Sequence, residues 1–90
     1  MAFLKLDYDI AVSQAEEIRK AGNTCNEVAD EISKQIAAIQ ESWEGDSSAA
    51  LITKLTEMQK KYNTLGTNLN KYATDIKSKA AQLRTIDESK

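Results

Sequence analysis

The segment WEGDSS at residues 43–48 lies at the midpoint of this 90-residue chain and decides how its two halves are arranged. Proline is absent and glycine occurs only three times, so Gly45 is the strongest turn signal in the sequence. Glycine takes the backbone dihedrals of a sharp helix-to-helix turn without steric cost. The polar residues 46–48 can cap a following helix. The segment therefore predicts a tight turn at residues 43–46.

Apolar residues recur on both sides of this turn in alternating steps of four and three. The first stripe runs from Ala15 to Trp43, and the second runs from Leu51 to Ile86 with Lys79 as its one interruption. Such spacing over four or more heptads indicates paired helices, and it does not fit strands. We expect a hairpin or dimer seam made of Ile18, Cys25, Ile32, Ile36, Ile39, Leu55, Met58, Tyr62, Leu65, Leu69 and Ile76.

The pattern predicts an all-α single domain over residues 1–90, with helices at about 8–42 and about 47–85. Asp7 and Asp9 are candidate N-caps of the first helix. One apolar stripe per helix cannot stay exposed in water, so the helices should fold back into an antiparallel hairpin. Residue i then faces approximately residue 89 − i, which places Gly22 level with Gly66 and suggests a close crossing there.

The composition leaves little for chemistry. Histidine is absent and Cys25 is the only cysteine, which excludes a zinc cluster, a Cys/His pair and a histidine base. Cys25 falls on the apolar stripe, so a core position is favoured over a reactive thiol. We expect no enzymatic activity, no cofactor and no metal.

The charge distribution favours protein partners. The net charge of −2 argues against nucleic-acid binding. Residues 1–45 carry nine acids and four bases, whereas residues 46–90 carry five acids and eight bases. Oppositely charged halves favour antiparallel packing within a chain or between copies. The sequence contains neither a signal-peptide pattern nor 18 consecutive apolar residues, so any export should bypass the general secretory route.

The triplet Trp43-Glu44-Gly45, set midway between two heptad-patterned helices, resembles the WXG family of ESAT-6-like proteins, and the resemblance covers the whole chain. It implies a hairpin that dimerises into an elongated four-helix bundle, with itself (a homodimer is favoured) or with a related WXG-type protein. It also implies export without a cleaved signal peptide by a type VII (ESX-like) system of Gram-positive or mycobacterial cells. The implied partners are the secretion ATPase and, for an adaptor, a larger co-secreted toxin.

The family's export signal places an acid four residues after a tyrosine, and this chain departs from it. Tyr72 is followed at that spacing by Ile76, and Asp75 comes one residue early. Tyr72 and Asp75 are thus a degenerate export-signal candidate, with a seam tyrosine and a solvated charge as the simpler interpretation. Phe3 and Asp7 have the four-residue spacing but precede the predicted helix.

Three functions remain open at this stage. The favoured one is a secreted type VII substrate or adaptor that acts by protein–protein binding. The alternatives are an intracellular coiled-coil structural or adaptor protein, and a membrane-disrupting effector, for which amphipathic helices are necessary but insufficient.

Overall fold

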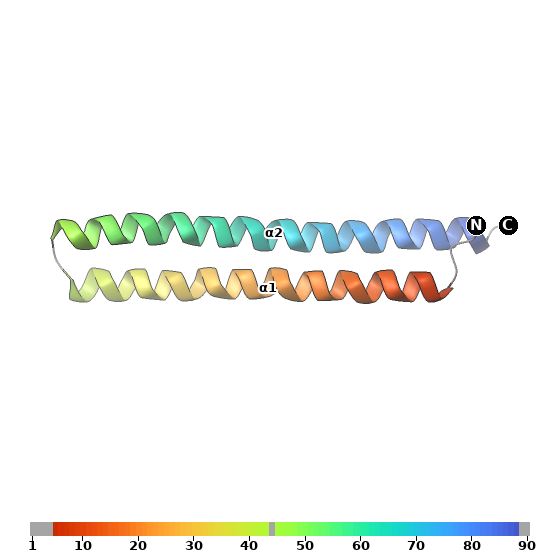
Figure 1. The fold of residues 1–90 in the computed structure, drawn as a ribbon, viewed down its shortest axis with the longest axis horizontal. Helices are drawn as coiled ribbons and strands as arrows, with labels where there is room; N and C mark the ends of the chain where they lie inside the picture. Colours follow the sequence, from red (N-terminus) through yellow and green to blue (C-terminus); the bar gives the residue numbers. More distant parts are fainter. Residues whose placement is uncertain (1–4, 44, 89–90) are drawn as a thin grey trace.

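A computed structural model describes residues 5–43 and 45–88, which form two long helices. Helix α1 spans Lys5–Ser42 and helix α2 spans Asp46–Glu88. They lie side by side and antiparallel, so that α1 begins and α2 ends at the same end of the molecule (Figure 1). The result is a rod of 69 × 14 × 14 Å. The predicted all-α hairpin is confirmed.

The helix ends differ from the predicted boundaries. Helix α1 already includes Lys5, so Asp7 and Asp9 lie inside it and the prediction that they cap it is wrong. An acidic residue in the first turn still interacts favourably with the positive end of the helix dipole, which is the role left to Asp7. Helix α2 continues to Glu88, where an ion pair from Arg84 (2.8 Å) supports the last turn.

The turn is built on Gly45, which has a φ of +99°. The Trp43 N–H still donates to the Ile39 carbonyl at 2.8 Å, so the helical pattern continues to the residue before the turn. The Gly45 carbonyl accepts the N–H of Ala49 at 3.3 Å and the Ser48 hydroxyl at 2.8 Å. Ser48 is therefore a donor to the turn here rather than the N-terminal acceptor that the sequence suggested.

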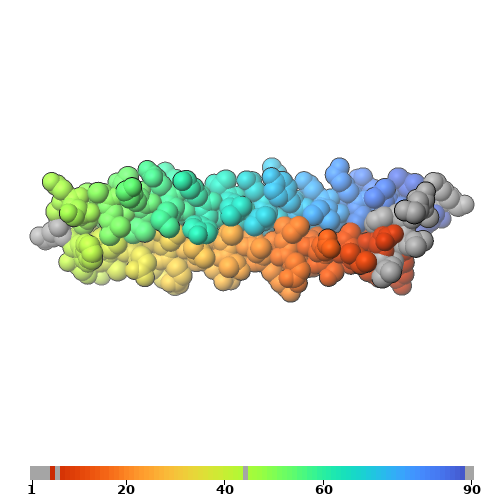
Figure 2. All heavy atoms as spheres, viewed as in Figure 1, coloured from red at the N-terminus to blue at the C-terminus, as the bar shows by residue number. Residues whose placement is uncertain are grey.

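Small residues line the contact between the helices. The buried apolar side chains are Ala15, Ala29, Ile32, Ala73 and Ala80. Side chains of the two helices meet along the length of the rod (Figure 2). Alanine seams let two helices approach closely, but each alanine removes little apolar area from water. Among the described residues, no large side chain is completely buried by the hairpin alone.

Gly22 and Gly66 form a close crossing, at the level that the sequence predicts. A Cβ atom on Gly22 would lie 2.9 Å from the Gly66 carbonyl oxygen, and one on Gly66 would lie 2.7 Å from the Gly22 carbonyl oxygen. On the register of Gly22 and Gly66, Gln59 would face Ala29, yet its side chain donates to Ser33, four residues further along α1. Side chains lean toward the N-terminus of their own helix, and in an antiparallel pair the two displacements add. The backbones therefore meet near the middle of the rod.

Candidate partner-binding face

One flank of the hairpin carries the polar contacts between the helices. Lys77 forms an ion pair with Glu16, and Asn70 donates to the Asn23 side chain at 3.5 Å. Residues 16 and 23 are one heptad apart, and so are residues 70 and 77, so these contacts follow one edge of the seam. This polar flank ties the two helices together and fixes their register.

The opposite flank is apolar. On α1, large or half-buried side chains follow each small seam residue by three positions, as Ile18 follows Ala15. On α2 they follow by three or precede by one, as Leu69 and Leu65 do around Gly66. These residues are rotated about each helix axis in the same direction from the small seam residues. In an antiparallel pair, such residues of the two helices lie on the same flank. We call this flank the apolar face: Ile18, Cys25, Ile32, Ile39, Leu55, Met58, Tyr62, Leu65, Leu69, Tyr72, Ile76, Leu83 and Ile86.

Exposure on the apolar face is concentrated on α2. Met58, Leu65, Tyr72, Leu83 and Ile86 each expose between 45% and 56% of their surface. A monomeric protein rarely leaves such a continuous row of large apolar side chains in water. The hairpin thus presents one exposed apolar surface that extends along most of α2.

The predicted seam residues divide between two environments. Ile32 is buried, whereas Met58 and Leu65 are exposed. The others are half-buried: Ile18, Cys25, Ile36, Ile39, Leu55, Tyr62, Leu69 and Ile76. The apolar stripe thus includes both the small residues of the hairpin contact and the large residues beside it. The cross-helix contacts of Asn23, Ser33, Gln59 and Asn70 went unpredicted, because a search for apolar spacing passes over polar residues.

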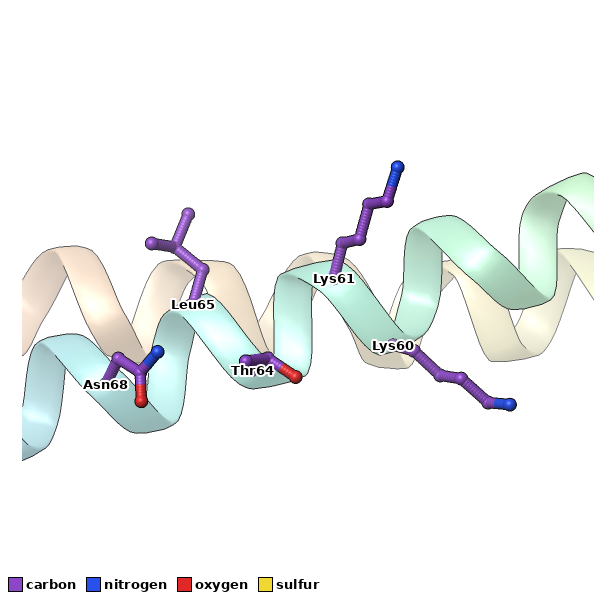
Figure 3. A pocket seen from close by; sticks show the side chains of 5 residues that line it. All are labelled: Lys60, Lys61, Thr64, Leu65 and Asn68. Carbon is purple, nitrogen blue, oxygen red and sulfur yellow. The ribbon is translucent and has the colours of Figure 1, made fainter.

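The outer surface of α2 is only slightly hollowed. The hollow shown in Figure 3 is lined by Lys60, Lys61, Thr64, Leu65 and Asn68, all from α2, with α1 behind them. The side chains of Lys61 and Leu65 project to the same side, and Lys60 points away from them. A hollow formed by one helix cannot enclose a small molecule, but a neighbouring helix could rest on it. Lys61 therefore lies at the edge of the apolar face.

The candidate recognition residues lie at separate places on the rod. Trp43 exposes 55% of its surface beside the turn, so much of the indole is in contact with solvent. Tyr72 exposes 56%, and Asp75 is also exposed. Tyr72 is about 40 Å along α2 from the turn, at 1.5 Å per residue, so a single hairpin does not bring the two aromatics together. Glu44 and Phe3 lie outside the described residues.

Two ionic clusters join the helices near the end opposite the turn. Hydrogen bonds from Arg19 (2.8 Å) and from Lys77 lower the pKa of the Glu16 carboxyl to about 2. The guanidinium of Arg84 lies 4.7 Å from the centre of the Tyr8 ring, a cation–π contact between α2 and α1. The bond to Glu88 raises the pKa of Arg84. Polar contacts thus reinforce a part of the rod where the buried residues are alanines.

Within residues 5–43 and 45–88, no group of three potential ligand side chains is placed to hold a metal ion. Over the same residues, neither helix combines the length and apolarity needed to cross a membrane. Residues 4–88 match the WXG100 family, described as proteins of 100 residues with WXG. No curated protein and no solved structure matches the chain.

Proposed function

We propose, from the premise that this chain belongs to the WXG100 family, that it binds a second helical hairpin through its apolar face and is exported by a type VII (ESX-like) secretion system. The observation that carries this proposal is the row of exposed apolar side chains on α2, next to a hairpin turn that carries the family's Trp43 and Gly45. The chain acts by protein–protein binding rather than by catalysis.

A helical partner suits this surface because the exposed residues recur at heptad spacing. Met58, Leu65 and Tyr72 follow one another at intervals of seven. A facing helix that carries its own heptad stripe can insert side chains between them along the whole rod. The product is an elongated four-helix bundle, formed with another copy or with a related WXG-type hairpin.

Export proceeds without a cleaved signal peptide in this proposal, and the secretion ATPase is the intracellular partner. The exposed Trp43 is available to that machinery at the turn end of the rod. Tyr72 and Asp75 are a second, degenerate recognition element on α2. Where export depends on a partner's signal, this hairpin serves as the adaptor of a larger co-secreted toxin.

The test is export from the native cell. A tagged chain should accumulate in the medium of growing cells while a cytoplasmic marker stays inside, and deletion of the type VII ATPase should retain it. Retention of the chain in cells with an active system would contradict the proposal and favour an intracellular coiled-coil protein. Asp75→Ala and Glu27→Ala, tested in the same strain, separate a signal at Asp75 from a general effect of losing an exposed negative charge.

A further inference from the structure

We propose that Met58 makes the apolar face sensitive to oxidation: a peroxide converts its thioether to a sulfoxide, and the oxidised hairpin loses its affinity for a second hairpin. This inference rests on the proposed function, because it concerns the same face. It adds a modification site and a chemical signal that controls binding. The reacting atom is the Met58 sulfur, Sδ.

The Met58 side chain is accessible in the free hairpin. It exposes 45% of its surface, and it lines a shallow hollow on α2 together with Lys61, Tyr62 and Leu65. It is the one methionine among the described residues, since Met1 lies outside them. The other exposed large residues of the face are leucines, an isoleucine and a tyrosine, which lack a sulfur that peroxide can oxidise. Peroxide thus finds the most reactive exposed side chain of the face at Met58.

Met58 also lies in the part of the face that a partner would cover. It is one heptad before Leu65 on α2, and the neighbouring Gln59 bonds to Ser33 of α1. That contact places Met58 within one helical turn of the level of Ile32, the one buried apolar side chain larger than alanine in the described part of the chain. A partner's side chains packed at this level would exclude water from the sulfur.

The reaction needs only a peroxide, such as hydrogen peroxide, as co-reactant. A lone pair of the sulfur attacks one peroxide oxygen, so that an S–O bond forms while the O–O bond breaks. The proton of the transferred hydroxyl passes to the departing hydroxide, which leaves as water. The sulfur loses two electrons, the peroxide gains them, and methionine sulfoxide reductases reverse the change.

The sulfoxide changes the chemistry of the face at its most adaptable side chain. A thioether packs as a flexible apolar group, whereas a sulfoxide carries a hydrogen-bond acceptor on a polar, chiral sulfur. In the free hairpin, water satisfies this oxygen. Under a second hairpin, apolar side chains would cover it, and a polar group buried without a hydrogen-bond partner opposes binding. Oxidation therefore favours the unpaired hairpin.

The coupling between binding and oxidation works in both directions. Because the two events compete for the same side chain, a bound partner that covers Met58 also protects it from peroxide. Oxidation is thereby confined to hairpins without a partner, and the oxidised hairpins remain without one until the sulfoxide is reduced.

The first test compares the Kd before and after treatment with hydrogen peroxide, using whichever hairpin the parent chain binds. Peptide mass spectrometry follows the conversion of Met58. The Kd should rise by about tenfold or more, and treatment with methionine sulfoxide reductases should restore it. An unchanged Kd after full conversion of Met58 would overturn the inference.

Two variants identify the group responsible, and each is compared with its own untreated sample. Met58→Leu keeps an apolar side chain without a thioether, so its Kd should not respond to peroxide. Cys25→Ala removes the free thiol of the face and should respond as the parent does. A response in Met58→Leu, or its loss in Cys25→Ala, would assign the effect to another group and contradict the proposal.

The second test is the rate of oxidation, which requires no stable oxidised product. Met58 sulfoxide is measured after brief exposure to excess peroxide, at hairpin concentrations below and above the Kd. The rate at Met58 should fall several-fold as the paired fraction rises, while free methionine in the same solution reacts equally at every concentration. A rate that does not depend on pairing would place Met58 outside the covered surface and overturn the inference.

The outcomes separate this inference from the proposed function. A chain that binds a second hairpin equally well before and after oxidation refutes the inference and leaves the proposed function intact. An untreated chain that binds no hairpin refutes the proposed function, and the inference with it.

Discussion

Trp43 directly follows the last residue of α1 and has more than half of its surface in water, although it is the largest side chain near the turn. A buried tryptophan typically contributes about 3 to 5 kcal/mol, and a half-exposed one contributes less. The turn itself is held by backbone and hydroxyl bonds around Gly45. The indole therefore contributes little to holding the turn, which supports its proposed role as a contact for another protein.

We predict that Trp43→Ala abolishes export while helicity and dimerisation persist, with a fall in Tm of only a few degrees. Circular dichroism, size-exclusion chromatography and secretion assays on the same variant check this. Ile32→Ala is the matched control, because Ile32 is buried and its truncation should lower Tm more than Trp43→Ala does. If Trp43→Ala lowered Tm as much as Ile32→Ala and lost export as well, the loss of export would be explained by a structural role of Trp43.

Glu16 makes the stability of the hairpin depend on pH. Its pKa in the folded chain is about 2, compared with an ordinary value of 4.5, because Arg19 and Lys77 donate to its carboxylate. A lowered folded-state pKa gives a contribution that is complete above pH 4.5 and is lost as pH falls from 4.5 toward 2. We predict that Glu16→Gln lowers Tm at pH 7 and flattens its decline over that window. Thermal melts at pH 7, 4 and 2 test this, with the exposed Glu27→Gln as control.

At the scale of the helices, the glycine crossing limits what either helix can accommodate. Alanine is favoured over glycine within a helix by about 1 kcal/mol, so a substitution there would ordinarily stabilise it. At Gly66 the added Cβ would approach the Gly22 carbonyl oxygen to 2.7 Å, and the helices would have to move apart. The cost of this contact with the backbone is greater than the gain in helix propensity.

We predict that Gly66→Ala lowers Tm by several degrees, whereas Thr67→Ala, at the exposed neighbouring position, changes stability by less than about 0.5 kcal/mol. Differential scanning calorimetry of both variants is the measurement. A Gly66→Ala variant as stable as the parent would mean that the helices cross elsewhere.

The sequence predicted the helices well and their ends poorly. The period of the stripes and the position of Gly45 led directly to an antiparallel hairpin, and the glycine register placed Gly22 against Gly66 as observed. The assignment of Asp7 as a cap failed because nothing between residues 5 and 9 prevents a helix from starting earlier. The apolar stripe also could not show which of its residues pack between the two helices and which remain exposed, because both groups recur with the same heptad spacing.

At the scale of the molecule, the hairpin is a long rod with a thin core. Its contact depends on four alanines, two glycines and Ile32, while larger apolar residues remain at the surface. Small chains with so little buried area usually need help from a partner to be stable. We therefore expect the second hairpin of the proposed bundle to contribute to the stability of this chain.

We predict that the purified chain is a dimer whose Tm rises with protein concentration, since mass action links unfolding to dissociation. Leu65→Asp should abolish dimerisation, because an unpaired charge in an apolar interface costs several kcal/mol. Lys60→Ala, a nearby substitution that points away from Leu65, should leave it intact. Light scattering and thermal melts over a hundredfold range of protein concentration test this prediction. A monomer whose Tm does not change with concentration would contradict it.

Helix α1 begins and helix α2 ends at the same end of the rod, and this arrangement also governs how the protein responds to force. A motor that pulls on the C-terminal end of α2 while α1 is held does not shear the two helices past each other. It peels them apart one contact at a time, beginning near Arg84 and Lys77 and reaching Gly45 last. Peeling loads few contacts at once, so the work is spread over many small steps. A hairpin of this shape yields easily to a translocating machine, even though sideways thermal opening must break the whole seam.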